Sequence, residues 1–208
     1  MHDDDAPGAQ RPVVTIFELY GAGAAEVGAR VARELGLPFH AQAFSSAALE
    51  GDTVDATDEA ATLATVLSVM GGAYGGLGGP DIIATQRATY DLVMSNNRQV
   101  WRYAAEGGVI VGRNAAVVLE GRPSTVHVLL VGPVDDRVRR AAETEGISLE
   151  VAAERQKRED VVRAEMSQVL YGWDPRLPER YDLVINTGRI PLEGAADAIV
   201  HALRGHLA

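Results

Sequence analysis

A glycine-containing turn joins a predicted strand to a predicted helix near the start of the chain. The turn reads Tyr20-Gly21-Ala22-Gly23-Ala24-Ala25-Glu26, and the run before it, Val13 to Phe17, is β-branched and aromatic. Backbone N–H groups at a helix N-terminus lack intrahelical partners and lie at the positive end of the helix dipole. The turn therefore predicts a cradle for an anion such as phosphate. The two glycines are equally compatible with a tight strand-to-helix connection alone.

A second candidate site follows another apolar strand. Gly108 to Gly112 form a short buried-type run, and Arg113 and Asn114 come directly after it. Open α/β sheets bind ligands at the carboxyl ends of their parallel strands, and the planar guanidinium of arginine matches phosphate. Arg113, with Asn114 beside it, is therefore a candidate ligand for a substrate phosphate. A surface ion pair is the alternative.

A cluster of charges lies on the predicted helix from Ser148 to Leu170. Arg155 and Arg163 each lie four positions from Glu159, which is ordinary pairing on a solvated helix face and the simplest explanation of the pattern taken alone. The cluster includes Arg155, Arg158, Asp160 and Arg163, and Lys157, between them, is the single lysine of the chain.

The elements that must position these residues alternate along the sequence. The predicted strands are apolar throughout, which indicates a mainly parallel sheet covered by helices on both faces, an α/β fold. Strands are expected at 13–17, 38–40, 109–111, 126–131 and 182–186, and helices at 24–35, 58–70, 81–105, 114–119, 135–144, 148–170 and 192–203. The helix at 81–105 carries an apolar stripe that includes Tyr90 and Trp101 and is expected to pack on a core. The glycine-rich segment 71–80 is expected to be a mobile connector.

Composition narrows the class of protein. The 208 residues are 47% apolar and 23% charged, as in an ordinary globular protein. A net charge of −10 argues against nucleic acid and anionic membranes as partners. The chain has no cysteine and no transmembrane or signal pattern, which favours a cytoplasmic location. The five histidines lack metal-ligand spacing, so no metal site is predicted from the protein side chains alone.

From Val14 to Leu203 the chain resembles the cytidylate kinase-like family of P-loop proteins. Three blocks carry the resemblance: Ile16 through Phe39 with its Tyr-Gly-Ala-Gly and Leu-Gly-Leu-Pro-Phe turns, the strand end at 108–114, and the stretches 146–163 and 181–187. The resemblance implies a P-loop nucleotide-kinase fold over 13–208, after an acidic disordered tail at 1–12. It also implies a helical acceptor-binding segment at 41–105 and a lid at 145–175.

The same resemblance assigns roles to the candidate residues. It implies that the turn from Tyr20 to Glu26 holds ATP with Mg²⁺, and that Arg113 meets the phosphate of CMP or a related acceptor. It implies that the charged residues of the lid, Arg155, Arg158, Asp160 and Arg163, act in catalysis. The apolar helices between 58 and 105 could pair two subunits into a homodimer.

The loop departs from the family at the positions that matter most for phosphate. A P-loop requires Gly-Lys-[Ser/Thr], and no Gly-Lys dipeptide occurs in the chain. Ala24 and Ala25 stand where relatives carry the alternative Gly-Arg, Glu18 stands where they carry a cation, and His40 precedes Ala41 and Gln42 where an aspartate is usual.

Three functions follow from this mixture. The chain is an active nucleoside monophosphate kinase, or a catalytically degenerate kinase fold that acts as a nucleotide sensor or protein-interaction module. In a third interpretation, the loop accepts a different ligand that hydrogen-bonds to Glu18. The intact Arg113, Asp160 and Arg163 favour a retained nucleotide site.

Overall fold

The computed structural model describes residues 10–43 and 82–207. Most of the predicted acidic tail lies outside these residues, as do the predicted helix at 58–70 and the glycine-rich segment 71–80. The described strands and helices follow one another in the predicted order. The boundaries drawn for an acceptor-binding segment and a lid stay predictions.

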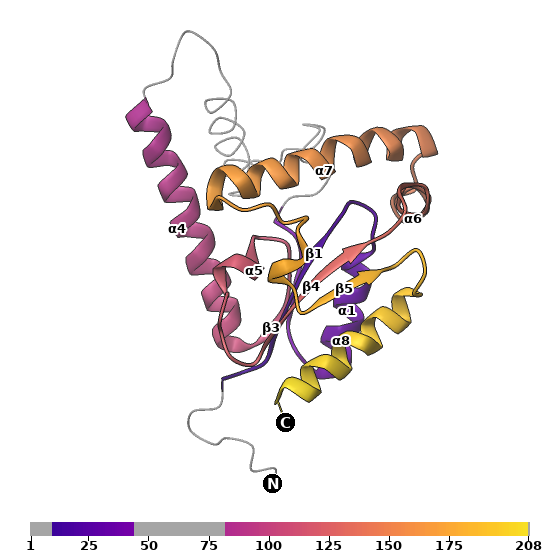
Figure 1. The fold of residues 1–208 in the computed structure, drawn as a ribbon, viewed down its shortest axis with the longest axis horizontal. Helices are drawn as coiled ribbons and strands as arrows, with labels where there is room; N and C mark the ends of the chain where they lie inside the picture. Colours follow the sequence, from indigo (N-terminus) through magenta and orange to yellow (C-terminus); the bar gives the residue numbers. More distant parts are fainter. Residues whose placement is uncertain (1–9, 44–81, 208) are drawn as a thin grey trace.

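Within the described ranges, five strands form one sheet in the order β2-β3-β1-β4-β5, with every neighbouring pair parallel (Figure 1). Val13 in the central β1 lies opposite Gly108 in β3 and Thr125 in β4. The predicted parallel sheet is thus confirmed, and the loops that follow β1 and β3 leave it at the same edge. The strands are β1 (Val13–Glu18), β2 (Phe39–His40), β3 (Gly108–Val111), β4 (Thr125–Val131) and β5 (Leu183–Asn186).

Helices cover both faces of the sheet. On one face lie α1 (Ala24–Leu35) and α8 (Leu192–Leu207), and on the other lie α4 (Ile82–Glu106) and α5 (Ala115–Val118) (Figure 1). Successive residues of β1 enter opposite cores because side chains of a strand alternate. Val14 and Ile16 pack with α1 and α8, while Val13 packs with α4 and α5. This two-sided burial explains why the strand is apolar at most of its positions.

Two further helices lie at the carboxyl edge of the sheet. These are α6 (Val134–Glu145) and the 23-residue α7 (Leu149–Tyr171), which runs across that edge (Figure 1). The Ser148 hydroxyl accepts a hydrogen bond from the Val151 N–H and caps the start of α7, and Gly172 in the left-handed conformation ends it. A short 3₁₀ helix, η1 (Pro178–Arg180), precedes β5.

The apolar stripe predicted on the helix at 81–105 is buried only in part. Val100 and Ala104 are fully buried against the sheet and α5, but Trp101 is 49% exposed and Tyr90 63% exposed. The expectation that Trp101 packs in the core is therefore wrong, because Val100 and Ala104 form the buried face of this part of α4 and the Trp101 side chain lies off that face. Among the described helices, none is both long and apolar enough to cross a membrane.

Candidate functional site

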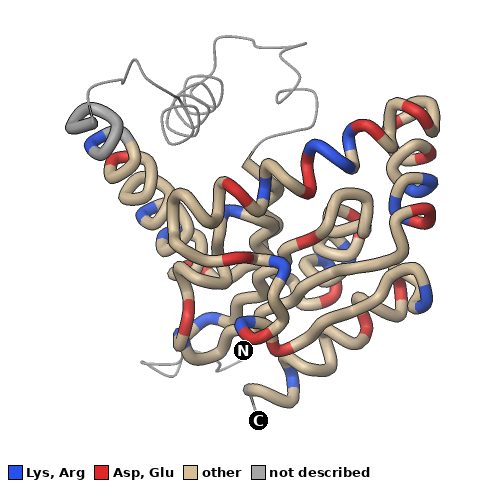
Figure 2. The backbone as a smooth tube through the Cα atoms, turned by 45° about the horizontal axis from the view of Figure 1, so that its top comes forward, with Lys and Arg blue, Asp and Glu red and all other residues tan. Residues whose placement is uncertain are grey.

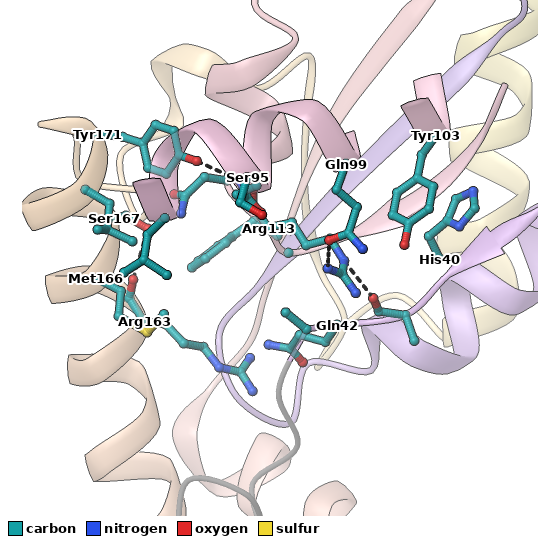
Figure 3. A pocket seen from close by; sticks show the side chains of 18 of the residues that line it. His40, Gln42, Ser95, Gln99, Tyr103, Arg113, Arg163, Met166, Ser167 and Tyr171 are labelled. Carbon is teal, nitrogen blue, oxygen red and sulfur yellow. Dashed lines mark hydrogen bonds between the residues drawn. The ribbon is translucent and has the colours of Figure 1, made fainter. Parts of the chain in front are cut away.

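A cavity of about 1020 Å³ opens between α4, α7 and the carboxyl ends of β2 and β3. Its lining contains four arginines and no aspartate or glutamate within the described residues. A cavity with one sign of charge concentrates ligands of the opposite sign. It is therefore suited to an anionic ligand. The arginines are Arg98 and Arg102 from α4, Arg113 from the turn after β3, and Arg163 from α7, the last two drawn in Figure 3.

The turn after β3 holds Arg113 in an unusual backbone conformation. Gly112, Arg113 and Asn114 have φ values of +69°, +57° and +53°, so two consecutive residues with side chains adopt the left-handed region. Such residues cost about 1–3 kcal/mol each and persist where the surroundings hold them. The Asn96 side chain donates to the Arg113 carbonyl at 2.8 Å, and the Trp173 indole donates to the Asn114 side chain at 3.0 Å.

The Arg113 guanidinium is held by neutral groups. Its Nη1 donates to the Gln99 side chain at 2.7 Å and its Nε to the Ala41 carbonyl at 3.2 Å (Figure 3). Within the described part of the chain it makes no ion pair, so its positive charge is not neutralised there. The structure thus places Arg113 where the sequence predicted, oriented by two acceptors and facing the cavity. Asn114 also lines the cavity, although Trp173 occupies its side-chain oxygen.

One wall of the cavity is a stacked ring pair. The rings of His40 and Tyr103 lie 3.7 Å apart, centroid to centroid, and nearly parallel. Burial lowers the pKa of His40, and the nearby Arg113 and Arg102 charges lower it further, outweighing Glu106. A neutral imidazole therefore occupies the place where the family resemblance predicted an aspartate.

Tyr171 connects the two helices that enclose the cavity. Its hydroxyl donates to the Asn97 side chain at 2.9 Å and accepts from the Asn96 side chain at 2.6 Å. Burial raises the pKa of Tyr171, so the hydroxyl keeps its proton. Sequence analysis missed these residues, and the only signal was a pair of asparagines inside an amphipathic helix.

The glycine-containing loop is not an open cradle. Glu18, the last residue of β1, accepts hydrogen bonds from the N–H groups of Gly23 and Ala24 through one oxygen, both at 2.9 Å. Its other oxygen lies 3.7 Å from Nη1 of Arg163, and the Glu18 side chain is 13% exposed. A carboxylate of the chain itself therefore occupies the anion position that the helix N-terminus provides.

The other groups of the loop are also engaged. The carbonyls of Tyr20, Gly21 and Ala22 accept from Arg137, Arg140 and Thr187 respectively, at 2.7–2.9 Å. A Cβ atom on Gly21 would lie 2.3 Å from the Arg137 carbonyl oxygen. The loop is thus packed tightly against α6 and the residues that follow β5. Sequence reasoning did not identify these three anchoring residues.

The predicted catalytic residues of α7 separate into different environments. Asp160 accepts from the Tyr20 N–H at 2.8 Å and from Arg137 at 3.0 Å, so it anchors the loop. Arg155 pairs with Glu145, which also accepts from the Tyr20 hydroxyl. Arg158 is exposed on a helix whose charges of both signs are interspersed (Figure 2). Of the four, only Arg163 lines the cavity.

Arg163 lies between the cavity and the loop. Its Nη2 donates to Glu159, which is fully buried, at 2.7 Å, and its Nη1 faces Glu18. With the Gln42 amide group turned so that its oxygen faces Arg163, that oxygen accepts hydrogen bonds from the guanidinium at 3.1–3.3 Å. The Arg163 guanidinium can therefore contact a ligand in the cavity or a group bound at the loop.

The residues of the loop do not fit a triphosphate donor in this arrangement. No cation lies within Tyr20 to Glu26, and Glu18 occupies two of the N–H groups. No reaction step through ATP or Mg²⁺ follows from this geometry.

The parallel sheet, its strand order and the loop after β1 define an α/β domain of the P-loop nucleotide-kinase type. A model of the cytidylate kinase-like family matches residues 13–189, and the chain belongs to that family. A solved structure of an uncharacterised protein from Eubacterium ventriosum has the same fold, with a TM-score of 0.65, 18% identity, and coverage of 93% of this chain and 99% of that one.

Curated relatives match about half of the chain. The cytidylate kinase of Ignicoccus hospitalis is 30% identical over 107 residues, which are 51% of this chain and 62% of that protein. The uronate isomerase of Corynebacterium glutamicum is 39% identical over 113 residues, which are 54% of this chain and 22% of that protein. The chain thus spans less than two thirds of the length of either relative.

Proposed function

We propose that this protein binds a nucleoside monophosphate, CMP or a related nucleotide, in the cavity between α4 and α7. The observation that carries the proposal is the lining of the cavity: four arginines, no carboxylate within the described residues, and Arg113 held by neutral acceptors on a strained turn. Membership of the cytidylate kinase-like family supports a nucleotide as the anionic ligand.

The cavity offers groups for each part of such a ligand. Arg113 and Arg163 face the same space from opposite sides, so a phosphate between them would receive charge-assisted hydrogen bonds from both (Figure 3). Apolar surface from Phe17, Phe39 and Met166 is available for the base and ribose. We place the phosphate between Arg113 and Arg163 and the base against these apolar side chains.

Phosphoryl transfer from ATP to the bound nucleotide is a second candidate function, favoured by family membership. The reaction would move the γ-phosphoryl group to a phosphate oxygen of CMP and yield ADP and CDP. The carboxylate on the loop and the missing loop cation favour the alternative, a nucleotide sensor without turnover. In either case the location we propose is the cytoplasm, where such nucleotides are found.

The binding proposal is tested by calorimetric titration of the full-length chain with CMP. Arg113→Gln should weaken binding by about 10- to 100-fold, because a hydrogen bond to a charged group contributes about 1.5–3 kcal/mol. Arg139→Gln, which removes an exposed arginine paired with Asp136 on α6, is the matched control and should bind as the wild type does. Equal affinity in both variants, or no binding of CMP to the wild type, would reject the proposal.

An ADP-release assay on the same samples, with ATP and Mg²⁺ added, separates the two candidate functions. Formation of ADP that depends on CMP would establish phosphoryl transfer. CMP binding with no ADP formed would establish the sensor.

A further inference from the structure

The Glu18 carboxylate occupies the position at the loop that a ligand phosphate would take. The Gly23 N–H and the Ala24 N–H belong to the N-cap and first residues of α1, and both point at the same carboxylate oxygen at 2.9 Å. Gly23 has no side chain, so the helix receives its cap from a carboxylate five residues earlier. The anion position of the loop is therefore filled from within the chain.

The surroundings keep Glu18 in this position. The loop carbonyls are bound by Arg137, Arg140 and Thr187, so the backbone has little room to reshape around a larger anion. A Cβ on Gly23 would lie 2.8 Å from the Leu192 side chain, which shows how closely α8 supports the loop from behind. Arg163 lies near the second Glu18 oxygen and helps to compensate its charge.

We propose that Glu18 is the specificity-determining residue of the loop: its carboxylate excludes polyphosphate, including ATP, from the N-terminus of α1. A phosphate group approaching these N–H groups would meet a negative charge in a mostly buried site that contains no loop cation. Like charges brought together in such a place repel strongly. Removing the charge of Glu18 should therefore allow the loop to bind polyphosphate.

This inference concerns the loop and does not depend on whether CMP occupies the cavity. The test is consequently a titration with pyrophosphate and then ATP, in the absence of CMP, so that a failure of CMP binding leaves the inference untouched. CMP-dependent ADP formation by the wild type would contradict it, because that reaction requires ATP at the loop. The variants are Glu18→Ala, which empties the position, and Glu18→Gln, which keeps the shape and one acceptor oxygen but removes the charge. Glu120→Gln, which removes an exposed carboxylate paired with Arg180, is the control.

Both Glu18 variants should bind pyrophosphate at least about tenfold more tightly than the wild type and the control. Because Glu18→Ala also removes a helix cap, the Glu18→Gln variant is compared by NMR as well. Pyrophosphate should shift the amide resonances of Gly23 and Ala24 in Glu18→Gln and leave them unshifted in the wild type. Equal affinity in wild type and variants, absence of binding in all of them, or shifted amides in the wild type would overturn the proposal.

Discussion

Two regions at the carboxyl edge of the sheet differ in whether their side chains favour a negatively charged ligand. The cavity beside α4 and α7 is lined by four arginines and, within the described residues, by no carboxylate. The loop after β1 contains no cation and has a glutamate bound to its N–H groups. The two regions therefore lie at the same edge of the sheet, but the side chains equip only the cavity for an anion.

The largest expected effect tests whether the loop is a packed part of the structure. Gly21→Ala should lower the free energy of unfolding by about 2–5 kcal/mol, measured by urea denaturation. The left-handed backbone accounts for about 1–2 kcal/mol, and the overlap of the new Cβ with the Arg137 carbonyl for about 1–3 kcal/mol more.

Gly36→Ala is the matched control for that prediction. Gly36 has a similar φ of +66° at the end of α1, but its Cβ would meet no atom within 4 Å among the described residues. Gly36→Ala should therefore lower the free energy of unfolding only by the contribution of the left-handed backbone, about 1–2 kcal/mol. If the two variants were equally stable, the loop would be free to move away from α6, and the contrast with the open cavity would lose its structural basis.

A smaller effect concerns the rim of the cavity. Arg98→Gln and Arg102→Gln should each weaken CMP binding by about two- to fivefold, because these side chains are exposed and water screens their charge. The effect should shrink when the titration is repeated at high salt. Arg87→Gln, an exposed arginine of the same helix outside the cavity lining, is the control. An identical loss in all three variants would mean that net charge, not the cavity, governs affinity.

The sequence predicted the architecture well because the signals for it are local. The central strands β1, β3 and β4 are mostly apolar, and two-sided burial in a parallel sheet requires that pattern. The position of Arg113 could also be predicted, since a residue directly after a buried parallel strand must lie at the ligand edge. What the sequence could not show is the left-handed turn, which depends on hydrogen bonds from Asn96 and Trp173.

The details of the loop could not be predicted because they depend on distant residues. Glu18 was expected to oppose a bound phosphate, but its hydrogen bonds to Gly23 and Ala24 depend on side-chain direction. The catalytic role that the resemblance implied for Asp160 stays a prediction, but its hydrogen bond from the Tyr20 N–H, 140 residues away in the chain, could not be foreseen. The charge pattern of α7 is the same whether it faces solvent, a ligand or this loop, so spacing alone could not distinguish these outcomes.

The smallest expected effect concerns the protonation of His40 in the wall of the cavity. The pKa of His40 is lower in the folded chain than the ordinary value of 6.5, first because of burial and then because of Arg113 and Arg102. As pH falls through 6.5, the unfolded state takes up the proton before the folded state does, so the free energy of unfolding decreases. This contribution is fully present above pH 6.5 and is lost as pH falls toward the folded pKa.

Removing His40 should therefore make stability less sensitive to acid. His40→Gln is compared with the wild type by urea denaturation at pH 7.5, 6.5 and 5.5. The variant should lose less free energy of unfolding over that interval. The two slopes of free energy against pH should differ by less than the slope expected for one bound proton. His201→Gln, a substitution of an exposed histidine on α8, is the control and should follow the wild-type curve. His127, whose pKa burial also lowers, remains in all three proteins and contributes equally to each. A His40→Gln curve parallel to the wild type would show that neither burial nor the nearby arginines lower the pKa of His40 in the folded chain.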